Sequence, residues 1–283
     1  MIAIGIIFGK ILQNQSMKKF ISLIITIIIF TMLYSCKEKE SDPGRIKLSF
    51  NEKVDGELLK TDTLAYVNEA GNHYMVNEVQ YFISKFTLYF NNGESYTVKD
   101  NMGIHYVDSD IHDSRYWSVP DDIPSGYPDS IVFVFGLDEA DNQSNIFLNP
   151  PESNMFWPEQ LGGGYHYMKM NGKYLNNNGI LAPFNFHLGI GQTYDTTGQV
   201  TGFVQNYFKV SFPLVMLSSL PVEIKPNQTT NLILTMNIES WFKTPNTWDF
   251  NTMGVMMMQN QEAMHAACEN GRDVFSIGAL YEL

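Results

Sequence analysis

The chain has 283 residues, and because 30 are acidic and 18 are basic its formal net charge is −12. This balance excludes a nucleic-acid-binding protein, since affinity for phosphate backbones comes from clustered Lys and Arg, and it excludes attraction to an anionic membrane surface by charge alone. Hydrophobic residues make up 44% of the chain, which excludes a disordered protein.

The first predicted element is an N-terminal export signal. A charged start at residues 17–19 precedes the apolar run 20–33, so we expect translation to begin at Met17. The run ends in Leu-Tyr-Ser-Cys36, which resembles the lipobox of bacterial lipoproteins. That resemblance implies cleavage before Cys36 and lipidation of its thiol. A single transmembrane anchor is the alternative, because the apolar stretch is longer when it is counted from Ile2.

Residues 1–35 are therefore interpreted as a lipoprotein signal peptide and residues 36–44 as a tether, because this charged stretch ends in Pro-Gly and cannot bury a core. Lys followed by acidic residues after the lipidated Cys resembles the surface-export tag of Bacteroidetes lipoproteins. We expect an outer-membrane lipoprotein that is held by its lipid and faces the periplasm or the exterior. Without residues 1–35 the chain has 15 basic and 30 acidic residues, a net charge of −15.

Only one other cysteine, Cys268, remains if Cys36 carries a lipid. An intramolecular disulfide and a cysteine-based zinc site are then both excluded. The domain that begins at residue 45 must be stabilised by a hydrophobic core, which about 240 residues can supply.

Short strands dominate the rest of the chain. Apolar and polar residues alternate from Ile46 onward, and turn sequences such as Asn-Asn-Gly separate the apolar segments. The predicted strands are 46–51, 64–68, 78–89, 95–98, 104–107, 130–135, 166–170, 184–188, 203–212 and 231–238. This pattern predicts an antiparallel sandwich or barrel.

One helix is predicted near the C-terminus, from about residue 255 to residue 268. Met257, Gln261, Met264 and Cys268 have the spacing of one helix face, and Asn-Gly follows as a stop signal.

The sequence lacks the motifs of common enzymes: no G-x-S-x-G, P-loop, G-x-G-x-x-G after a strand, or H-E-x-x-H is present. We therefore expect a protein that is not an enzyme. Carboxylates do cluster in two predicted loops, and such clusters form either a solvated rim or a site for a hard cation such as calcium. The clusters are Asp108, Asp110 and Asp113 beside His112, and Asp138, Glu139 and Asp141.

A second kind of metal site is indicated by the segment around His166. On a strand that begins near residue 165, His166 and Met168 would point to one face, and imidazole with thioether is a ligand pair that suits Cu(I). A four-residue loop at 175–178 would set His166 directly opposite His187, with Cβ atoms about 4.5 to 5.5 Å apart. The alternative is that the histidines are hydrogen-bonded core residues and that the methionine fills a gap.

An ordered set of short motifs resembles the MbnP-like family over nearly all of the mature chain. These motifs include Tyr81-Phe82-Ile83-Ser84, Gly136-Leu137-Asp138, Met155-Phe156-Trp157, Gly164-Tyr165, Phe186-His187-Leu188-Gly189, Glu239-Ser240-Trp241-Phe242 and Met256-Met257. Members include methanobactin-associated periplasmic proteins, and they resemble the surface copper protein MopE. The resemblance implies a β-sandwich, an extracytoplasmic location and copper binding without catalysis. We therefore expect an all-β fold, an antiparallel Greek-key β-sandwich over residues 45–283 with a short C-terminal helix.

Two departures limit what is transferred from the family. Its characterised members use a copper ligand made by oxidising a tryptophan to kynurenine, two residues before a ligating histidine, and no tryptophan here has a histidine at that spacing. Glu159 also stands where the family has a second tryptophan. His187 therefore carries over best, and His166 and Met168 rest on strand geometry. Trp157 is expected to be a modified residue or one that supports the ligands from behind.

A further candidate is His265, which lies with Met264 and the methionines at 256–258 in a tract that suits copper. An amphipathic helix that packs its methionine face on the sandwich is the interpretation that we prefer for this tract.

Two functions follow from these observations. The first is a copper-binding lipoprotein for copper uptake, storage or handling, with a partner oxidase or transporter. The second is a cell-surface binding module without a metal, which grips a polymer or a partner protein through Trp157, Tyr165 and Trp248. Convergence of the two histidines would favour the first, whereas an exposed aromatic patch would favour the second.

Overall fold

The computed structural model describes residues 19–20, 22–24, 41–214 and 222–280. The expected lipidation site Cys36 and most of the apolar run 20–33 lie outside these residues. Within the described part of the chain, no helix is long and apolar enough to cross a membrane. The chain divides into two compact units, Met1–Ser41 and Asp42–Leu283, and the fold below is that of the second.

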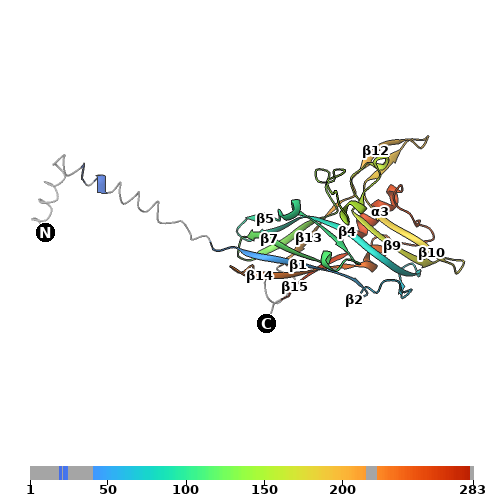
Figure 1. Ribbon diagram of the computed structural model, residues 1–283, viewed down its shortest axis with the longest axis horizontal. Helices are drawn as coiled ribbons and strands as arrows, with labels where there is room; N and C mark the ends of the chain where they lie inside the picture. Colours follow the sequence, from blue (N-terminus) through green and yellow to red (C-terminus); the bar gives the residue numbers. More distant parts are fainter. Residues whose placement is uncertain (1–18, 21, 25–40, 215–221, 281–283) are drawn as a thin grey trace, which may run out of the picture. The chain divides into compact units, whose positions relative to one another are not determined.

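Strands are the main regular secondary structure of the second unit (Figure 1). Among the described residues, one sheet has five strands in the order β15-β14-β1-β2, with β7 also paired to β1. Its strands are β1 (Gly44–Val54), β2 (Glu57–Leu58), β7 (Tyr116–Ile123), β14 (Thr229–Asn237) and β15 (Phe275–Leu280). β1 and β14 run parallel, while the other pairs of this sheet are antiparallel.

The second sheet has eight strands in the described part of the chain, with the path β10-β9-β4-β8-β13. The long strand β4 also pairs with β3, β5 and β6, so it is the centre of this sheet. The strands are β3 (Tyr66–Val67), β4 (His73–Phe90), β5 (Ser95–Thr97), β6 (Ile104–Asp108), β8 (Pro128–Phe135), β9 (Met168–Leu175), β10 (Leu181–Leu188) and β13 (Phe208–Pro213).

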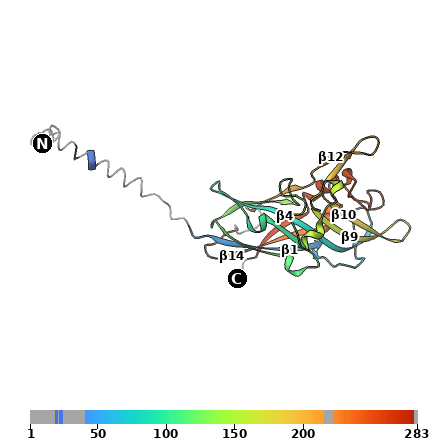
Figure 2. The ribbon, with the colours of Figure 1, turned by 45° about the horizontal axis from the view of Figure 1, so that its top comes forward.

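The remaining elements are short. A two-stranded hairpin of β11 (Gly191–Tyr194) and β12 (Val200–Val204) extends beyond the sandwich (Figure 2). The α-helix α3 comprises Gln261–Gly271. Short 3-10 helices are η1 (Asp100–Gly103), η2 (His112–Arg115), η3 (Glu152–Met155), η4 (Glu159–Leu161) and η6 (Ile238–Phe242).

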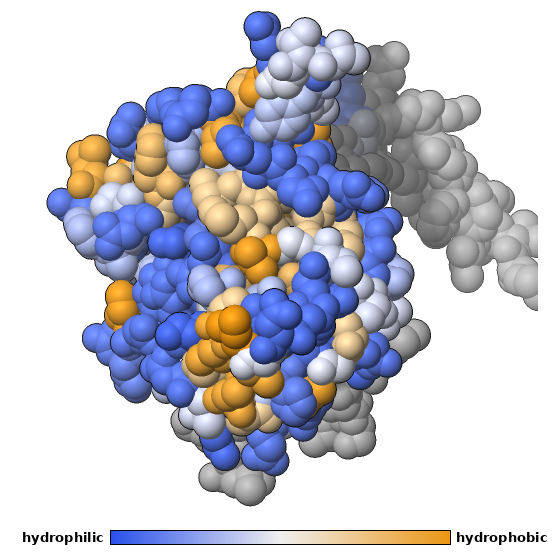
Figure 3. Space-filling model, turned by 90° about the vertical axis from the view of Figure 1, so that its right-hand side faces the viewer, coloured by the Kyte–Doolittle hydropathy of each residue, from blue (hydrophilic) through white to orange (hydrophobic). Residues whose placement is uncertain are grey.

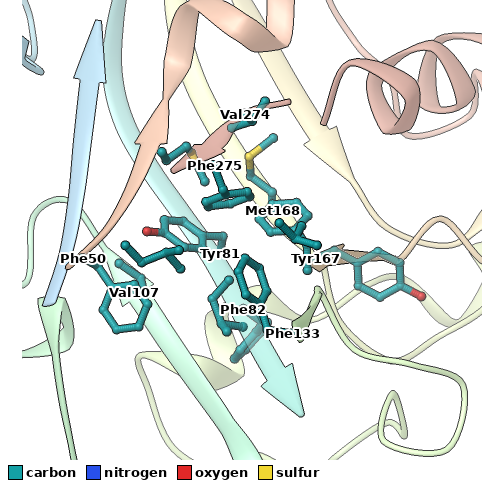
Figure 4. Packing of buried hydrophobic residues seen from close by; sticks show 14 of the residues in the cluster. Phe50, Tyr81, Phe82, Val107, Phe133, Tyr167, Met168, Val274 and Phe275 are labelled. Atoms are coloured by element: carbon teal, nitrogen blue, oxygen red, sulfur yellow. The ribbon is translucent and has the colours of Figure 1, made fainter. Parts of the chain in front are cut away.

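The core lies between the two main sheets and is rich in aromatic rings. Alternating residues of β1 are buried, as the period of two predicted. Phe50 of β1, Tyr81 of β4, Phe133 of β8 and Phe275 of β15 belong to this core (Figure 4). Phe82, the next residue of β4, is buried on the other face of its sheet against Phe147 and Tyr165. The predicted all-β sandwich is therefore confirmed, with one parallel strand pair where only antiparallel pairs were expected.

Several boundaries differ from the predicted ones. The segment 203–212 is not one strand, because residues 205–207 separate β12 from β13. The strand β7 was not predicted, and it contains Pro120 and two acidic residues, which weaken the strand pattern. The helix α3 begins at Gln261 instead of residue 255, because the Asn260 side chain accepts a hydrogen bond from the backbone N–H of Ala263 at 3.0 Å and caps the helix there.

The predicted register of the β9–β10 hairpin is wrong. Residue 174 pairs with Ala182 instead of Gly179, so His187 lies opposite Lys169. The reason is the turn: the side-chain oxygen of Asn176 accepts the backbone N–H groups of Asn178 and Ile180, which closes a longer loop than expected.

Candidate metal centre

His187 lies near the end of β10, on the face of the sheet that points away from the core. Phe186 and Leu188, its neighbours along the strand, are buried in the core, and side chains alternate along a strand. Asn185 and His187 therefore share the outer face. Lys169 of β9 lies opposite His187 on that face.

His166 approaches this position from a different segment. Two residues before β9 the chain leaves the ladder, and the backbone N–H of His166 donates to the carbonyl of Met155 at 2.6 Å. The next residue, Tyr167, still donates its backbone N–H to Leu188 at 2.7 Å. Because the chain departs from the sheet at this point, His166 lies at the end of β10. His166 is only 6% exposed.

The two imidazoles meet there. Their ring centroids are 5.1 Å apart and the planes are inclined by 82°, an edge-to-face contact. A metal ion at about 2 Å from one nitrogen of each ring fits this separation. His166 and His187 do not meet through the predicted register, which the structure does not have; they converge because His166 leaves the ladder.

The proton on His187 is placed by a chain of two hydrogen bonds. Glu78 can only accept when ionised, so the amide nitrogen of Asn171 donates to the Glu78 carboxylate. The amide oxygen of Asn171 is then directed at Nε2 of His187, 2.7 Å away, and Nε2 must carry the proton. Nδ1 of His187 is left with its lone pair, and it is buried without a hydrogen-bond partner.

The proton on His166 is placed in the same way. Its Nδ1 lies 2.9 Å from the carbonyl oxygen of Met155, which can only accept, so Nδ1 carries the proton. Nε2 of His166 is therefore the free acceptor, and it too is buried without a partner. An imidazole that binds a metal typically donates its other N–H to a carbonyl or carboxylate, and both rings are arranged in this way.

Both imidazoles are neutral near pH 7. Burial lowers the pKa of His166 from 6.5 to about 4. Burial, with the adjacent His166 and Lys169, lowers the pKa of His187 to about 3. The two lone pairs are consequently present at neutral pH, which metal binding requires.

Trp157 forms one wall of the pair. Its ring is fully buried and lies edge to face with His166, with centroids 4.6 Å apart. The indole N–H donates to the carbonyl of Leu161 at 3.1 Å. A Cβ at Gly189 would lie 2.6 Å from the indole, so this close packing requires glycine there.

The expectation that Met168 shares a face with the histidines is wrong. Met168 pairs with Leu188 and Tyr81, whose side chains are on the core face, and it is 0% exposed. Figure 4 shows its sulfur beside Phe275, inside the sandwich. The thioether of Met168 is thus on the opposite side of the sheet from His187.

The carboxylate clusters do not form a calcium site. Asp138 and Asp141 both contact the ammonium group of Lys85, which occupies the place of a cation. Asp108 accepts hydrogen bonds from Tyr106 at 2.7 Å and from Gln80 at 3.0 Å. No group of three or more His, Cys, Asp and Glu side chains in the described residues is arranged to hold a metal.

Neither His265 nor the aromatic residues of the second proposed function lie where a binding role would need them. His265 is exposed on α3 and lies 3.5 Å from Glu269, whereas Met264 is buried, so the methionine face of the helix packs on the sandwich as we preferred. The residues of the second proposed function are all in the core, so they form no exposed patch. Trp157 and Trp248 are 0% exposed and Tyr165 is 1% exposed.

Two residues of the centre were missed by sequence reasoning, Asn171 and Glu78. The signal for Asn171 was present, because it alternates with the buried residues of β9 and so lies on the outer face with His187. Glu78 could not be found from spacing, because β4 comes beside β9 only in the folded sheet.

Comparisons with known proteins agree with the fold. The family model described as MbnP matches residues 43–259. Among solved structures, MbnP from Methylosinus trichosporium is similar with a TM-score of 0.52 and 15% identity, over 84% of this chain and 99% of that chain. At this identity the likeness shows the fold alone. No curated protein matches the chain.

Proposed function

The chain belongs to the MbnP family, and we propose that it binds copper outside the cytoplasm through His166 and His187, for copper uptake, storage or handling. Family membership supports the class of protein. The ligands are supported by the geometry of this chain.

One observation carries the proposal. Two neutral imidazoles lie 5.1 Å apart, and each has a buried nitrogen whose lone pair has no partner. An unsatisfied buried polar atom costs about 1–3 kcal/mol, so one on each of two contacting imidazoles needs a reason, and a bound metal ion supplies one. Imidazole nitrogens suit copper, and the family resemblance favours copper over zinc.

The chemistry of the centre favours binding over catalysis. Burial lowers the pKa of His166 to about 4 and that of His187 to about 3, so both rings are weak proton acceptors at neutral pH. We therefore propose a copper-binding protein that is not an enzyme. Trp157, which touches His166, is the residue that we expect to be oxidised or to hold the His166 ring in place by packing against it.

Location follows from the export signal. We propose that Cys36 carries a lipid, that the domain is held at the outer membrane facing the periplasm or the exterior, and that an oxidase or a transporter is its partner. Mass spectrometry of the N-terminal peptide from the native host tests the lipid, and an unmodified Met17 start with an intact signal would contradict it.

The copper proposal is tested by titrating metal-free, purified full chain with Cu(I). We expect near-stoichiometric uptake, loss of uptake in His187→Ala, and normal uptake in His73→Ala, which removes an exposed imidazole. Circular dichroism shows whether the variants are folded. Unchanged uptake in folded His187→Ala contradicts the assignment.

A further inference from the structure

The short segment that contains Val255 and Met256 pairs with the free edge of β10, next to the candidate metal centre. β10 is the outermost strand of its sheet. The backbone N–H of Asn185 donates to the carbonyl of Val255 at 2.7 Å, and Asn185 forms a parallel bridge with Met256. The segment that carries Met256 is thus held in register with β10.

The register decides which way Met256 faces. Residues that pair across a sheet present their side chains on the same face, so Met256 shares the outer face with Asn185 and hence with His187. The solvent exposure of the two neighbouring methionines agrees with an outward-facing Met256. Met256 is 65% exposed, whereas the next residue, Met257, is 1% exposed. Met256 is one of the large hydrophobic residues that are exposed at the surface. Figure 3 shows that hydrophobic residues reach the surface at several places on the face of the domain drawn there.

The distance is suitable for a long side chain. His187 is two residues beyond Asn185, so it is the diagonal neighbour of Met256 across the strand pair. Two residues along a strand span about 6.6 Å and neighbouring strands lie about 4.8 Å apart, so the two Cα atoms are roughly 8 Å apart, a span that long side chains bridge. Methionine has three rotatable bonds and adapts its sulfur position at little cost.

The histidine pair lacks a third donor. No group of three or more His, Cys, Asp and Glu side chains in the described part of the chain could hold a metal, and Met168 faces the core. We propose, as an extension of the copper function above, that the thioether of Met256 is the third ligand and gives the centre its preference for Cu(I). Soft thioether ligands select Cu(I), whereas imidazole alone also suits Zn(II).

The test compares the purified full chain with Met256→Leu and with Met102→Leu. Met102 is 59% exposed on η1, so its variant is a matched control that removes one surface thioether elsewhere. Cu(I) affinity is measured by competition with a chromophoric chelator, Zn(II) affinity by calorimetry, and sulfur ligation by copper X-ray absorption. We expect Met256→Leu to weaken Cu(I) binding about tenfold or more, to leave Zn(II) affinity within about twofold, and to lose the Cu–S scattering seen in wild type and in Met102→Leu.

The outcomes separate the two proposals. If the wild type shows no Cu–S scattering, or if Met256→Leu binds Cu(I) as wild type does while His187→Ala does not, the role of Met256 is wrong and the histidine centre stands. If wild type takes up no Cu(I), both proposals are wrong. Unfolding is not expected to confuse the result, because the Met256 side chain is exposed and leucine has nearly its volume.

Discussion

The imidazoles of His166 and His187 lie edge to face with centroids 5.1 Å apart, although the two residues are not partners in the β9–β10 ladder. His166 reaches this position because its backbone N–H and its Nδ1 both donate to the carbonyl of Met155, which draws it out of the sheet. The centre therefore depends on the irregular segment before β9 as much as on the strands.

The hydrogen bonds behind His187 are expected to tune its affinity for metal. Asn171→Ala removes the acceptor that holds the proton on Nε2, so Nδ1 is no longer kept free. We expect copper affinity to fall about 10- to 100-fold, the usual effect of losing such a partner. Chelator competition measures it. Lys173→Ala, two residues along the same face of β9 and exposed, is the control, and equal affinities in the two variants would refute this role.

Met168 is expected to be irrelevant to the metal. Its sulfur is on the core face, so Met168→Leu should leave Cu(I) affinity within about twofold and cost less than about 1.5 kcal/mol of stability. Affinity and denaturant unfolding are measured on the same samples. A large loss of Cu(I) affinity with normal stability would restore the thioether of Met168 as a ligand.

The packing of Trp157 on Gly189 is expected to be sensitive to one methyl group. In Gly189→Ala the new Cβ would meet the indole at 2.6 Å, so the ring and the adjacent His166 must shift. We expect a loss of about 1–3 kcal/mol in the free energy of unfolding and weaker copper binding. Gly278→Ala, where nothing lies within 4 Å, is the control for the substitution itself. Equal stability of both variants would show that the contact is not tight.

Acid is expected to destabilise the metal-free protein. Burial lowers the pKa of His105 and of His166 to about 4, and that of His187 to about 3. Unfolded histidine binds its proton near pH 6.5, so between about pH 6.5 and 4 the unfolded state holds more protons, and stability falls as the pH falls. Glu52 has the opposite effect on the pH dependence of stability. Burial raises its pKa, so the folded state binds its proton more readily and the contribution of Glu52 to stability increases as the pH falls.

Urea unfolding at pH 7.5 and pH 4.5 measures this effect, and we expect a decrease of about 2 kcal/mol or more. His105 is stacked between Phe50 and Trp117, so His105→Phe keeps a ring there and should make the pH dependence weaker. Equal or greater stability at pH 4.5 would contradict the assigned neutral histidines.

The sequence predicted the sandwich because its core strands alternate cleanly, as β1 does. It did not predict β7, where Pro120 interrupts the pattern, or the hairpin register, which depends on the side-chain hydrogen bonds of Asn176. The two histidines could be singled out from their neighbours in the chain. The position of Asn171 on the outer face of β9 could also be read from the strand pattern. Glu78 of β4 and the carbonyl of Met155 could not be found, because they come beside the site only after folding.

The most direct test of the copper centre is anomalous diffraction at the copper edge from crystals of the copper-loaded protein. We expect one strong peak at about 2 Å from Nε2 of His166 and from Nδ1 of His187, the two nitrogens that are free in the structure. A copper ion bound elsewhere, or bound through the nitrogen of His187 that faces Asn171, would contradict the account.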